Sequence, residues 1–212
     1  MRLHVCQLQQ ANSDVIKHAL DHLARAGLPE DEYTRLRDIR NERARAASVG
    51  ARLALLWALT DDAEGLSVHG LDERPPAEEK PLSDFCRTEH GAPCLGEGDP
   101  AISFAHSDRL AVCALSHKRR IGVDIEPLDR RIARAEDIAA RYFSKGERAL
   151  LADATDRDLA FLRIWTQKEA LGKALGTGLN ADAERLDTTA YPDDCFFEHI
   201  VEGEMVSGCV LI

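Results

Sequence analysis

The chain has 212 residues, of which 44% are hydrophobic and 30% are charged, a composition that excludes disordered, collagen-like and low-complexity proteins. Its formal net charge of −10 disfavours a nonspecific nucleic-acid binder, because such proteins carry the opposite charge. No apolar run approaches the roughly 20 residues of a membrane span, and the first residues are too polar for a secretory signal. We therefore expect a cytoplasmic protein that acts on neither nucleic acid nor membrane. We also expect a monomer.

The first half of the chain predicts helices followed by irregular chain and a short strand. Helical spacing of apolar residues covers 12–26 and 30–59, and Pro29 suits the start of the second helix. Residues 72–84 form a charged segment interrupted by prolines, which predicts a loop. A short strand is expected over 101–107.

The second half alternates between strand and helix patterns. Residues 110–116 and 121–128 are strand-like, and the short polar segment between them predicts a hairpin. Helices are expected over 131–143 and 156–175, the second ended by a Gly-Thr-Gly turn. The alternation over 196–210 predicts a closing hairpin that turns at a glycine.

The six cysteines are scattered and contain no Cys-x-x-Cys pair, so they are expected to be thiols rather than zinc-ribbon or redox-motif cysteines. Cys86, His90 and Cys94 lie close together in the sequence. Their spacing fits no standard zinc finger, and no fourth ligand is evident. We expect them to be loop residues.

Two acidic residues share one face of the strand Gly122-Val123-Asp124-Ile125-Glu126. Side chains alternate along a strand, so Asp124 and Glu126 point to the same side. Such a pair repels itself unless a cation lies between, and Mg²⁺ prefers carboxylate oxygens. Solvent-facing acids on an edge strand are the simpler alternative.

The last predicted helix repeats chemistry-bearing residues every four positions. Trp165, Glu169 and Lys173 therefore stack on one side of the helix. An exposed Glu–Lys ion pair would explain the last two by themselves. Beside a strand with two carboxylates, however, a third carboxylate completes a metal site, and a lysine one turn further can contact a phosphate.

Arginines form two stripes on predicted helices. Arg45 and Arg52 are seven residues apart and share a face. Arg130, Arg134 and Arg141 line up beside the helix over 131–143, where they can attract an acidic partner. An ordinary solvated helix face is the alternative in both cases.

Three segments together resemble the Sfp-type 4′-phosphopantetheinyl transferase family: Gly122–Glu126, Arg141–Glu147 and Trp165–Leu179. Their order and separation also fit that family. The resemblance is clear from about residue 91 to 179 and loose over the first 60. Each segment alone is unspecific, whereas their joint occurrence is specific.

The resemblance implies an α+β fold of two similar halves, related by a pseudo-twofold axis with a ligand cleft between them. We expect the halves to be residues 1–108 and 109–212, the second carrying the metal site. The implied reaction transfers the 4′-phosphopantetheine arm of coenzyme A to a serine of an apo acyl or peptidyl carrier protein and releases adenosine 3′,5′-bisphosphate. Coenzyme A is then a co-substrate, Mg²⁺ the cofactor and the carrier protein the partner.

The same resemblance assigns roles to individual residues. Asp124, Glu126 and Glu169 match the family's Mg²⁺ ligands. Lys173 matches its contact to the pyrophosphate, and His106 matches a contact to a phosphate of coenzyme A.

The serine proton must pass to a base, and the sequence leaves that base open. Glu169, Glu147 and a metal-bound water are the candidates for the base. The catalytic residues are therefore expected to be Glu169, Glu147 and Lys173. Glu147 matches the family's second acidic motif.

The chain departs from the family pattern at two positions. Ala92 stands where the family's Gly-Lys-Pro has lysine, and Ala105 stands where its Ser-His-Ser has the first serine. We expect Arg45 and Arg52 to bind coenzyme A in place of the missing lysine. A Mg²⁺-dependent nucleotide phosphohydrolase and a noncatalytic carrier-binding module are the alternative functions.

Overall fold

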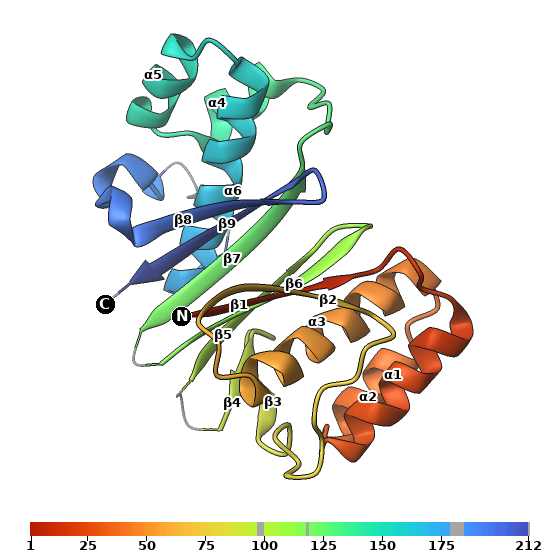
Figure 1. Cartoon of the computed structure of the whole chain (residues 1–212). Coiled ribbons are helices and arrows are strands. Elements are labelled where there is room, and N and C mark those ends of the chain that lie inside the picture. The colour runs from red at the N-terminus through yellow and green to blue at the C-terminus, as the bar shows by residue number, and fades with distance from the viewer. Residues whose placement is uncertain (97–99, 118, 179–184, 212) are drawn as a thin grey trace. The chain divides into compact units, whose positions relative to one another are not determined.

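The computed structural model describes residues 1–96, 100–117, 119–178 and 185–211. It contains two compact units, Met1–Arg119 (unit 1) and Arg120–Ile212 (unit 2). Each unit combines a β-sheet with helices (Figure 1), so the predicted α+β class is confirmed. Leu179, the last residue of the third sequence motif, lies outside the described residues. The pseudo-twofold axis and the cleft stay predictions.

Unit 1 is built on a four-stranded sheet with the order β2-β1-β6-β5. Its strands are β1 (Arg2–Gln7), β2 (Gly65–Gly70), β5 (Ala101–His106) and β6 (Leu110–Ser116). β1 pairs with β2 in parallel and with β6 antiparallel. The N-terminal strand β1, which the sequence did not predict, is therefore a central strand of the sheet.

Three helices cover this sheet, and the last of them is the one that contacts it most. They are α1 (Ser13–Arg25), α2 (Glu30–Arg37) and α3 (Glu42–Thr60). α3 lies on β1 and β6, and α1 and α2 pack against α3 (Figure 1). The single helix predicted over 30–59 is wrong: the chain breaks between α2 and α3, where the Asn41 side chain accepts a hydrogen bond from the amide of Ala44 and begins a new helix.

A small hairpin of β3 (Phe85–Arg87) and β4 (Pro93–Leu95) completes unit 1. Cys86 and Cys94 lie opposite each other on the two strands and are joined by a disulfide. The prediction that both are thiols is therefore wrong, because the pairing of these short strands brings their sulfurs together.

Unit 2 has a three-stranded sheet with the order β7-β9-β8. The strands are β7 (Arg120–Pro127), β8 (Phe196–Val201) and β9 (Glu204–Leu211). β8 and β9 form the predicted closing hairpin, whose turn uses the positive φ angles of Glu202 and Gly203. The hairpin predicted between 110–116 and 121–128 is wrong, because β6 pairs with β1 and β5, whereas β7 pairs with β9. The same pairing explains why the units divide after Arg119 rather than after residue 108.

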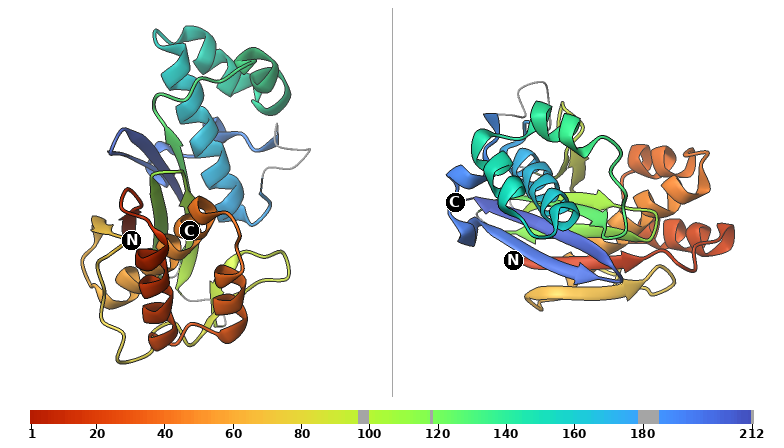
Figure 2. Two further views of the ribbon diagram at one scale, coloured as in Figure 1. Left: turned by 90° about the vertical axis from the view of Figure 1, so that its right-hand side faces the viewer. Right: turned by 90° about the horizontal axis from the view of Figure 1, so that it is seen from above.

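Three helices accompany this sheet: α4 (Ala135–Tyr142), α5 (Lys145–Asp153) and α6 (Arg157–Leu175). α6 packs along β7 and β9, and α4 and α5 lie beside its N-terminal half (Figures 1 and 2). α4 begins later than predicted because Arg134 adopts a left-handed conformation just before it. α5 was not predicted.

Across the described part of the chain, no helix combines the length and the apolar character that crossing a bilayer requires.

Candidate active site

Strand β7 directs Asp124 and Glu126 toward helix α6. A Cβ atom at Gly122, two residues before Asp124, would stand 1.9 Å from the carbonyl oxygen of Ala170 in α6. Because side chains alternate along a strand, Asp124 and Glu126 leave β7 on the side of this contact. Val123, on the opposite face, is fully buried. The absence of a side chain at Gly122 lets the helix approach the acidic strand closely.

Glu169 and Lys173 lie one turn apart on the same face of helix α6. The Lys173 ammonium donates hydrogen bonds to Asp124 Oδ1 at 2.9 Å and to the main-chain oxygen of Val123 at 2.8 Å. The helix ends three residues later at Gly176, whose φ of +74° suits a glycine C-cap. The structure thus brings Asp124 and Lys173 into direct contact.

Glu126 is held by an arginine from the segment that follows β7. The chain turns after Pro127, where the amide of Arg130 donates a hydrogen bond to the Pro127 carbonyl at 3.1 Å. This turn brings the Arg130 guanidinium back onto Glu126 Oε1, forming an ion pair. The Arg130 side chain keeps 49% of its surface exposed, and that of Glu126 keeps 13%.

The three carboxylates share one electrostatic environment. Burial raises the pKa of Asp124, against the opposing charge of Lys173. Burial also raises the pKa of Glu126, which Arg130 opposes. For Glu169, burial and then the negative charge of Asp124 raise the pKa, and Glu126 adds to this effect. Each acid is therefore close enough to the others for their charges to interact.

The donor chemistry fits a hard divalent cation, whereas the arrangement is not a closed metal site. Three carboxylates from two facing elements are the oxygen ligands that Mg²⁺ accepts. Among residues 1–96, 100–117, 119–178 and 185–211, however, no three His, Cys, Asp or Glu side chains stand together as a metal-binding group. Lys173 and Arg130 instead hold Asp124 and Glu126. A cation could bind Glu126 only after the Arg130 guanidinium moves away, and it would share Asp124 with Lys173.

Asp124, Glu126 and Glu169 are called the acidic cluster. The segment that carries this acidic cluster also matches known proteins. Residues 120–198 match the model of the 4′-phosphopantetheinyl transferase superfamily. This segment of unit 2 is therefore similar to the superfamily. Unit 2, which contains the matched residues, is called the superfamily domain.

Individual relatives agree with this assignment. The chain is 36% identical over 116 residues to the 4′-phosphopantetheinyl transferase HetI of Nostoc sp., covering 52% of this chain and 48% of HetI. It is 30% identical over 115 residues to the 4′-phosphopantetheinyl transferase Sfp of Bacillus subtilis, covering 51% and 48%. It is 36% identical over 99 residues to the 4′-phosphopantetheinyl transferase AcpT of Salmonella typhi, covering 45% and 51%. The chain thus spans about half the length of the curated relatives it matches.

Within the superfamily domain, Glu147 has a different setting from the one its predicted catalytic role requires. Its carboxylate accepts hydrogen bonds from Lys168 at 2.8 and 3.0 Å, from the Ser144 amide at 2.7 Å and from the amide and hydroxyl of Thr188 at 2.9 Å. The Glu147 and Lys168 side chains are fully buried. A carboxylate so occupied and so enclosed cannot reach a substrate hydroxyl, so Glu147 is reassigned to a structural role.

A sequence signal for this role existed. The Ser144 hydroxyl accepts a hydrogen bond from the Glu147 amide, and the Glu147 carboxylate accepts one from the Ser144 amide. This pair of bonds is the Ser-x-x-Glu capping box at the start of α5. Neither this motif nor the buried Lys168 was predicted from the sequence; Lys168 lies next to Glu169 in α6, but its ammonium binds Glu147.

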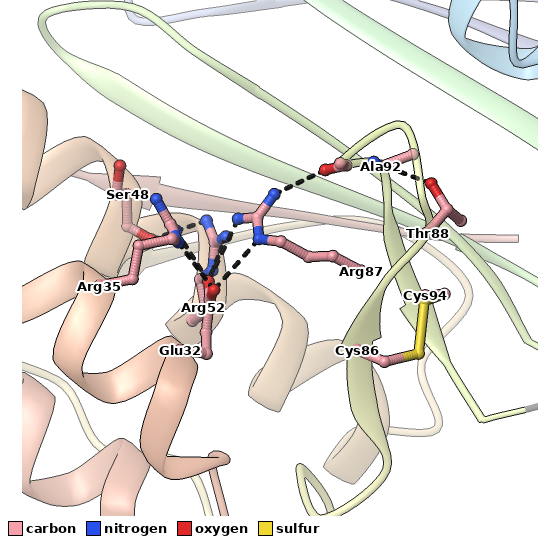
Figure 3. Close-up of polar contacts among 10 residues, drawn as sticks. Glu32, Arg35, Ser48, Arg52, Cys86, Arg87, Thr88, Ala92 and Cys94 are labelled. Atoms are coloured by element: carbon pink, nitrogen blue, oxygen red, sulfur yellow. Dashed lines mark hydrogen bonds and ion pairs between the residues drawn. A yellow bond between two sulfur atoms is a disulfide. The ribbon is translucent and has the colours of Figure 1, made fainter.

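In unit 1, Arg52 is a core residue rather than an exposed ligand contact (Figure 3). Its guanidinium donates to Glu32 Oε1 at 2.6 and 2.9 Å and lies over the ring of Phe104 at 4.8 Å. Arg35 and Arg87 bind the same carboxylate (Figure 3). The predicted role of Arg52 in binding coenzyme A is therefore not supported: only 4% of the residue is exposed, and Glu32 already engages its charge.

The other two predicted ligand contacts of unit 1 are more accessible. Arg45 is half-buried in the first turns of α3, and its buried Nε lacks a hydrogen-bond partner within the described chain. His106 is exposed at the end of β5.

A cavity of about 460 Å³ lies where the start of α3 meets the turn after β5. Arg43, Ala46, Asp108 and Arg109 are among its lining residues. Sequence analysis missed Arg43 and Arg109, because only the fold brings residues so far apart in the chain to one cavity.

The arginines proposed to attract an acidic partner are engaged within the superfamily domain. Arg130 binds Glu126, and exposed Arg134 binds exposed Asp137 at 2.7 Å. Arg141 lies over the ring of Tyr142 at 5.2 Å. Exposed pairs such as Arg134–Asp137 are weak, so their charges remain accessible to a partner.

Proposed function

We propose that the protein transfers the 4′-phosphopantetheine arm of coenzyme A to a serine hydroxyl of an apo acyl or peptidyl carrier protein. The observation that carries the proposal is the approach of β7 and α6, with three carboxylates and one ammonium group on their facing sides. The relatives HetI, Sfp and AcpT are named 4′-phosphopantetheinyl transferases, which supports this reaction class.

The reaction exchanges a phosphoanhydride bond of coenzyme A for a phosphodiester bond to the carrier serine. The serine oxygen forms a bond to the β-phosphorus of coenzyme A, while the bond from that phosphorus to the adenosine-bearing phosphate breaks. Adenosine 3′,5′-bisphosphate leaves, and the serine proton passes to a base. Negative charge on the phosphate oxygens has to be balanced throughout the transfer.

The residues of β7 and α6 suit this charge balance. Lys173 is held by the main chain of Val123 as well as by Asp124, so its ammonium can stay in place and bind a phosphate oxygen. Asp124, Glu126 and Glu169 would hold Mg²⁺, which supplies charge neutralisation and orients the pyrophosphate when bound.

The burial of the two candidate glutamates distinguishes them as acceptors of the serine proton. Glu147 has no exposed surface, whereas Glu169 is only half-buried on the face of α6 that carries Lys173. We assign Glu169 as the group that accepts the serine proton, directly or through one water molecule.

The basic residues of unit 1 suit the nucleotide end of coenzyme A. Arg45 has a buried donor without a partner in the described chain, and Arg43 and Arg109 line the neighbouring cavity. Guanidinium groups bind phosphate in a bidentate manner. We therefore propose that these arginines and His106 contact the phosphates of coenzyme A and replace the lysine missing at Ala92.

The test is to incubate the protein with coenzyme A, Mg²⁺ and several apo carrier proteins and to weigh the products by mass spectrometry. We expect each accepted carrier to gain one phosphopantetheine on a serine, with release of one adenosine 3′,5′-bisphosphate. The matched control is Asp124→Asn, which removes one proposed metal ligand at constant size.

Two other outcomes would overturn the proposal. Adenosine 3′,5′-bisphosphate formed from coenzyme A without a carrier would indicate a phosphohydrolase. Tight carrier binding with no mass gain under any of these conditions would indicate a noncatalytic binding module.

A further inference from the structure

Arg130 is held on Glu126 by one short turn of the chain. The Pro127–Arg130 turn follows directly on β7, and the guanidinium reaches back to Glu126 Oε1. Glu126 is largely enclosed, since 13% of its side chain is exposed, whereas 49% of the Arg130 side chain is exposed. The Glu126 carboxylate is therefore the less mobile partner, and the Arg130 guanidinium is the group that can move into solvent.

The two cations of the acidic cluster are held differently. Lys173 is anchored twice, by Asp124 and by the Val123 carbonyl. Among the described residues, the Arg130 guanidinium binds Glu126 alone. A partly exposed ion pair contributes little free energy and is readily exchanged. Arg130 is therefore the cation that a competing ion displaces most easily.

We propose that Arg130 is an internal competitor of the divalent cation for Glu126. This inference rests on the proposed function, in which Glu126 is a metal ligand. In the absence of metal, Arg130 neutralises Glu126 and limits the repulsion among the three carboxylates. When the metal binds, it takes the Glu126 oxygen, and the Arg130 guanidinium moves into solvent.

The competition sets the apparent metal affinity. A ligand that binds only one of two states has its apparent affinity reduced by the fraction of that state. Removal of the Arg130 charge should therefore tighten metal binding, by about two- to tenfold for a partly exposed pair. A residue that only stabilised the fold would instead weaken metal binding, or leave it unchanged, when substituted.

The experiment titrates the protein with Mn²⁺ in place of Mg²⁺ and measures free Mn²⁺ by electron paramagnetic resonance, with and without coenzyme A. Arg130→Gln is expected to bind Mn²⁺ more tightly than the wild type. Arg130→Lys, which keeps the charge, should stay close to the wild type. The matched control is Arg131→Gln, which removes the same charge at the next, exposed position.

A second readout follows Arg130 itself. The Arg130 Nε signal in nitrogen-15 NMR, assigned by its loss in Arg130→Lys, should move toward that of a solvated arginine as Mg²⁺ is added. An unchanged signal at saturating Mg²⁺ would contradict displacement.

The outcomes separate the inference from the function on which it rests. Equal Mn²⁺ affinity in the wild type, Arg130→Gln and Arg131→Gln would overturn the competition and leave the proposed metal site standing. Equal tightening in both glutamine variants would also overturn it, since general charge would then be the cause. If the wild type binds no more Mn²⁺ than a Glu169→Gln variant, both the metal site and the inference fail.

Discussion

Glu147 and Glu169 differ in what their carboxylates contact. Glu147 is fully buried against Lys168, Ser144 and Thr188, whereas Glu169 is half-buried and close enough to Asp124 for the two charges to interact. The same residue type thus serves a structural role in one case and a proposed chemical role in the other.

Substitution by glutamine separates these two roles. Glu169→Gln should lower carrier modification by about 10²-fold or more, as expected for loss of a base and metal ligand, without lowering stability. Glu147→Gln should lower the free energy of unfolding by about 3 kcal/mol, because it leaves Lys168 buried with its charge uncompensated. Mass-spectrometric rates and chemical denaturation measure the two effects. A stable but inactive Glu147→Gln protein would return Glu147 to the catalytic role.

The buried Glu32 makes the stability of unit 1 depend on pH. Burial alone would raise the pKa of Glu32, but hydrogen bonds from Arg35 and Arg87 outweigh it, and with the charge of Arg52 they bring the pKa from 4.5 to about 2. A lowered pKa in the folded state contributes stability above pH 4.5 that is lost as the pH falls toward 2.

We therefore expect Glu32→Gln to be clearly less stable than the wild type at pH 7, and the difference to shrink at pH 3. Urea denaturation at both pH values measures it. A difference that is constant with pH would show that the ionised form of Glu32 is not what stabilises the cluster.

At the level of secondary structure elements, the contact between β7 and α6 depends on Gly122. A Cβ atom there would stand 1.9 Å from the main-chain oxygen of Ala170 and 2.6 Å from the main-chain nitrogen of Ala174. Backbone atoms of a helix cannot move aside individually, so the whole helix has to shift.

Gly122→Ala should cost about 1–3 kcal/mol of stability, as overpacking does, and should also weaken Mn²⁺ binding by moving Glu169 away from Asp124. The control is Gly70→Ala, because the atom nearest to its Cβ is the end of the flexible Asp72 side chain. Thermal unfolding and Mn²⁺ titration measure both effects. Full Mn²⁺ affinity in Gly122→Ala would show that the close approach is not needed.

Periodicity predicted the elements whose signals are local. The helix of residues 156–175 and the closing hairpin are found nearly as predicted, because apolar spacing, a capping glycine and strand alternation lie within the segments themselves. The break between α2 and α3 was missed, since Asn41 was not recognised as a helix cap. The partners of β6 and β7 could not be predicted, because strand pairing depends on residues far away in the chain.

The site shows the same division. The faces of β7 and α6 follow from their periods of two and about 3.6 residues, so Asp124 could be placed with Glu126, and Glu169 with Lys173, from the sequence. That the two faces meet depends on the packing of α6 on β7, and a shared metal site stays a prediction. Which cation holds which acid could not be predicted, because the pairing of Arg130 with Glu126 depends on the geometry of one turn.

At the level of the whole molecule, the distribution of charge matters more than its sum. The chain carries a net charge of −10, so an acidic partner has to meet a locally positive surface. The exposed arginines of α4 and its flank supply charge of that sign, with Arg134 only weakly held by Asp137.

Charge reversal tests this docking surface. Arg134→Glu combined with Arg141→Glu should raise KM for the carrier roughly three- to tenfold, more at low salt than at high salt, with kcat little changed. Lys17→Glu combined with Arg25→Glu, an equal charge change at two exposed positions of α1, is the control. An unchanged carrier KM and salt dependence would exclude α4 as the docking surface.

The proposed reaction requires Asp124, Glu126 and Glu169 to bind one divalent cation together. The most direct measurement is the anomalous difference map of a crystal grown with Mn²⁺ and coenzyme A. We expect one strong peak within coordination distance of all three carboxylates, with the Arg130 guanidinium withdrawn from Glu126. A peak at other residues, or an intact Arg130–Glu126 pair beside a bound pyrophosphate, would contradict the account.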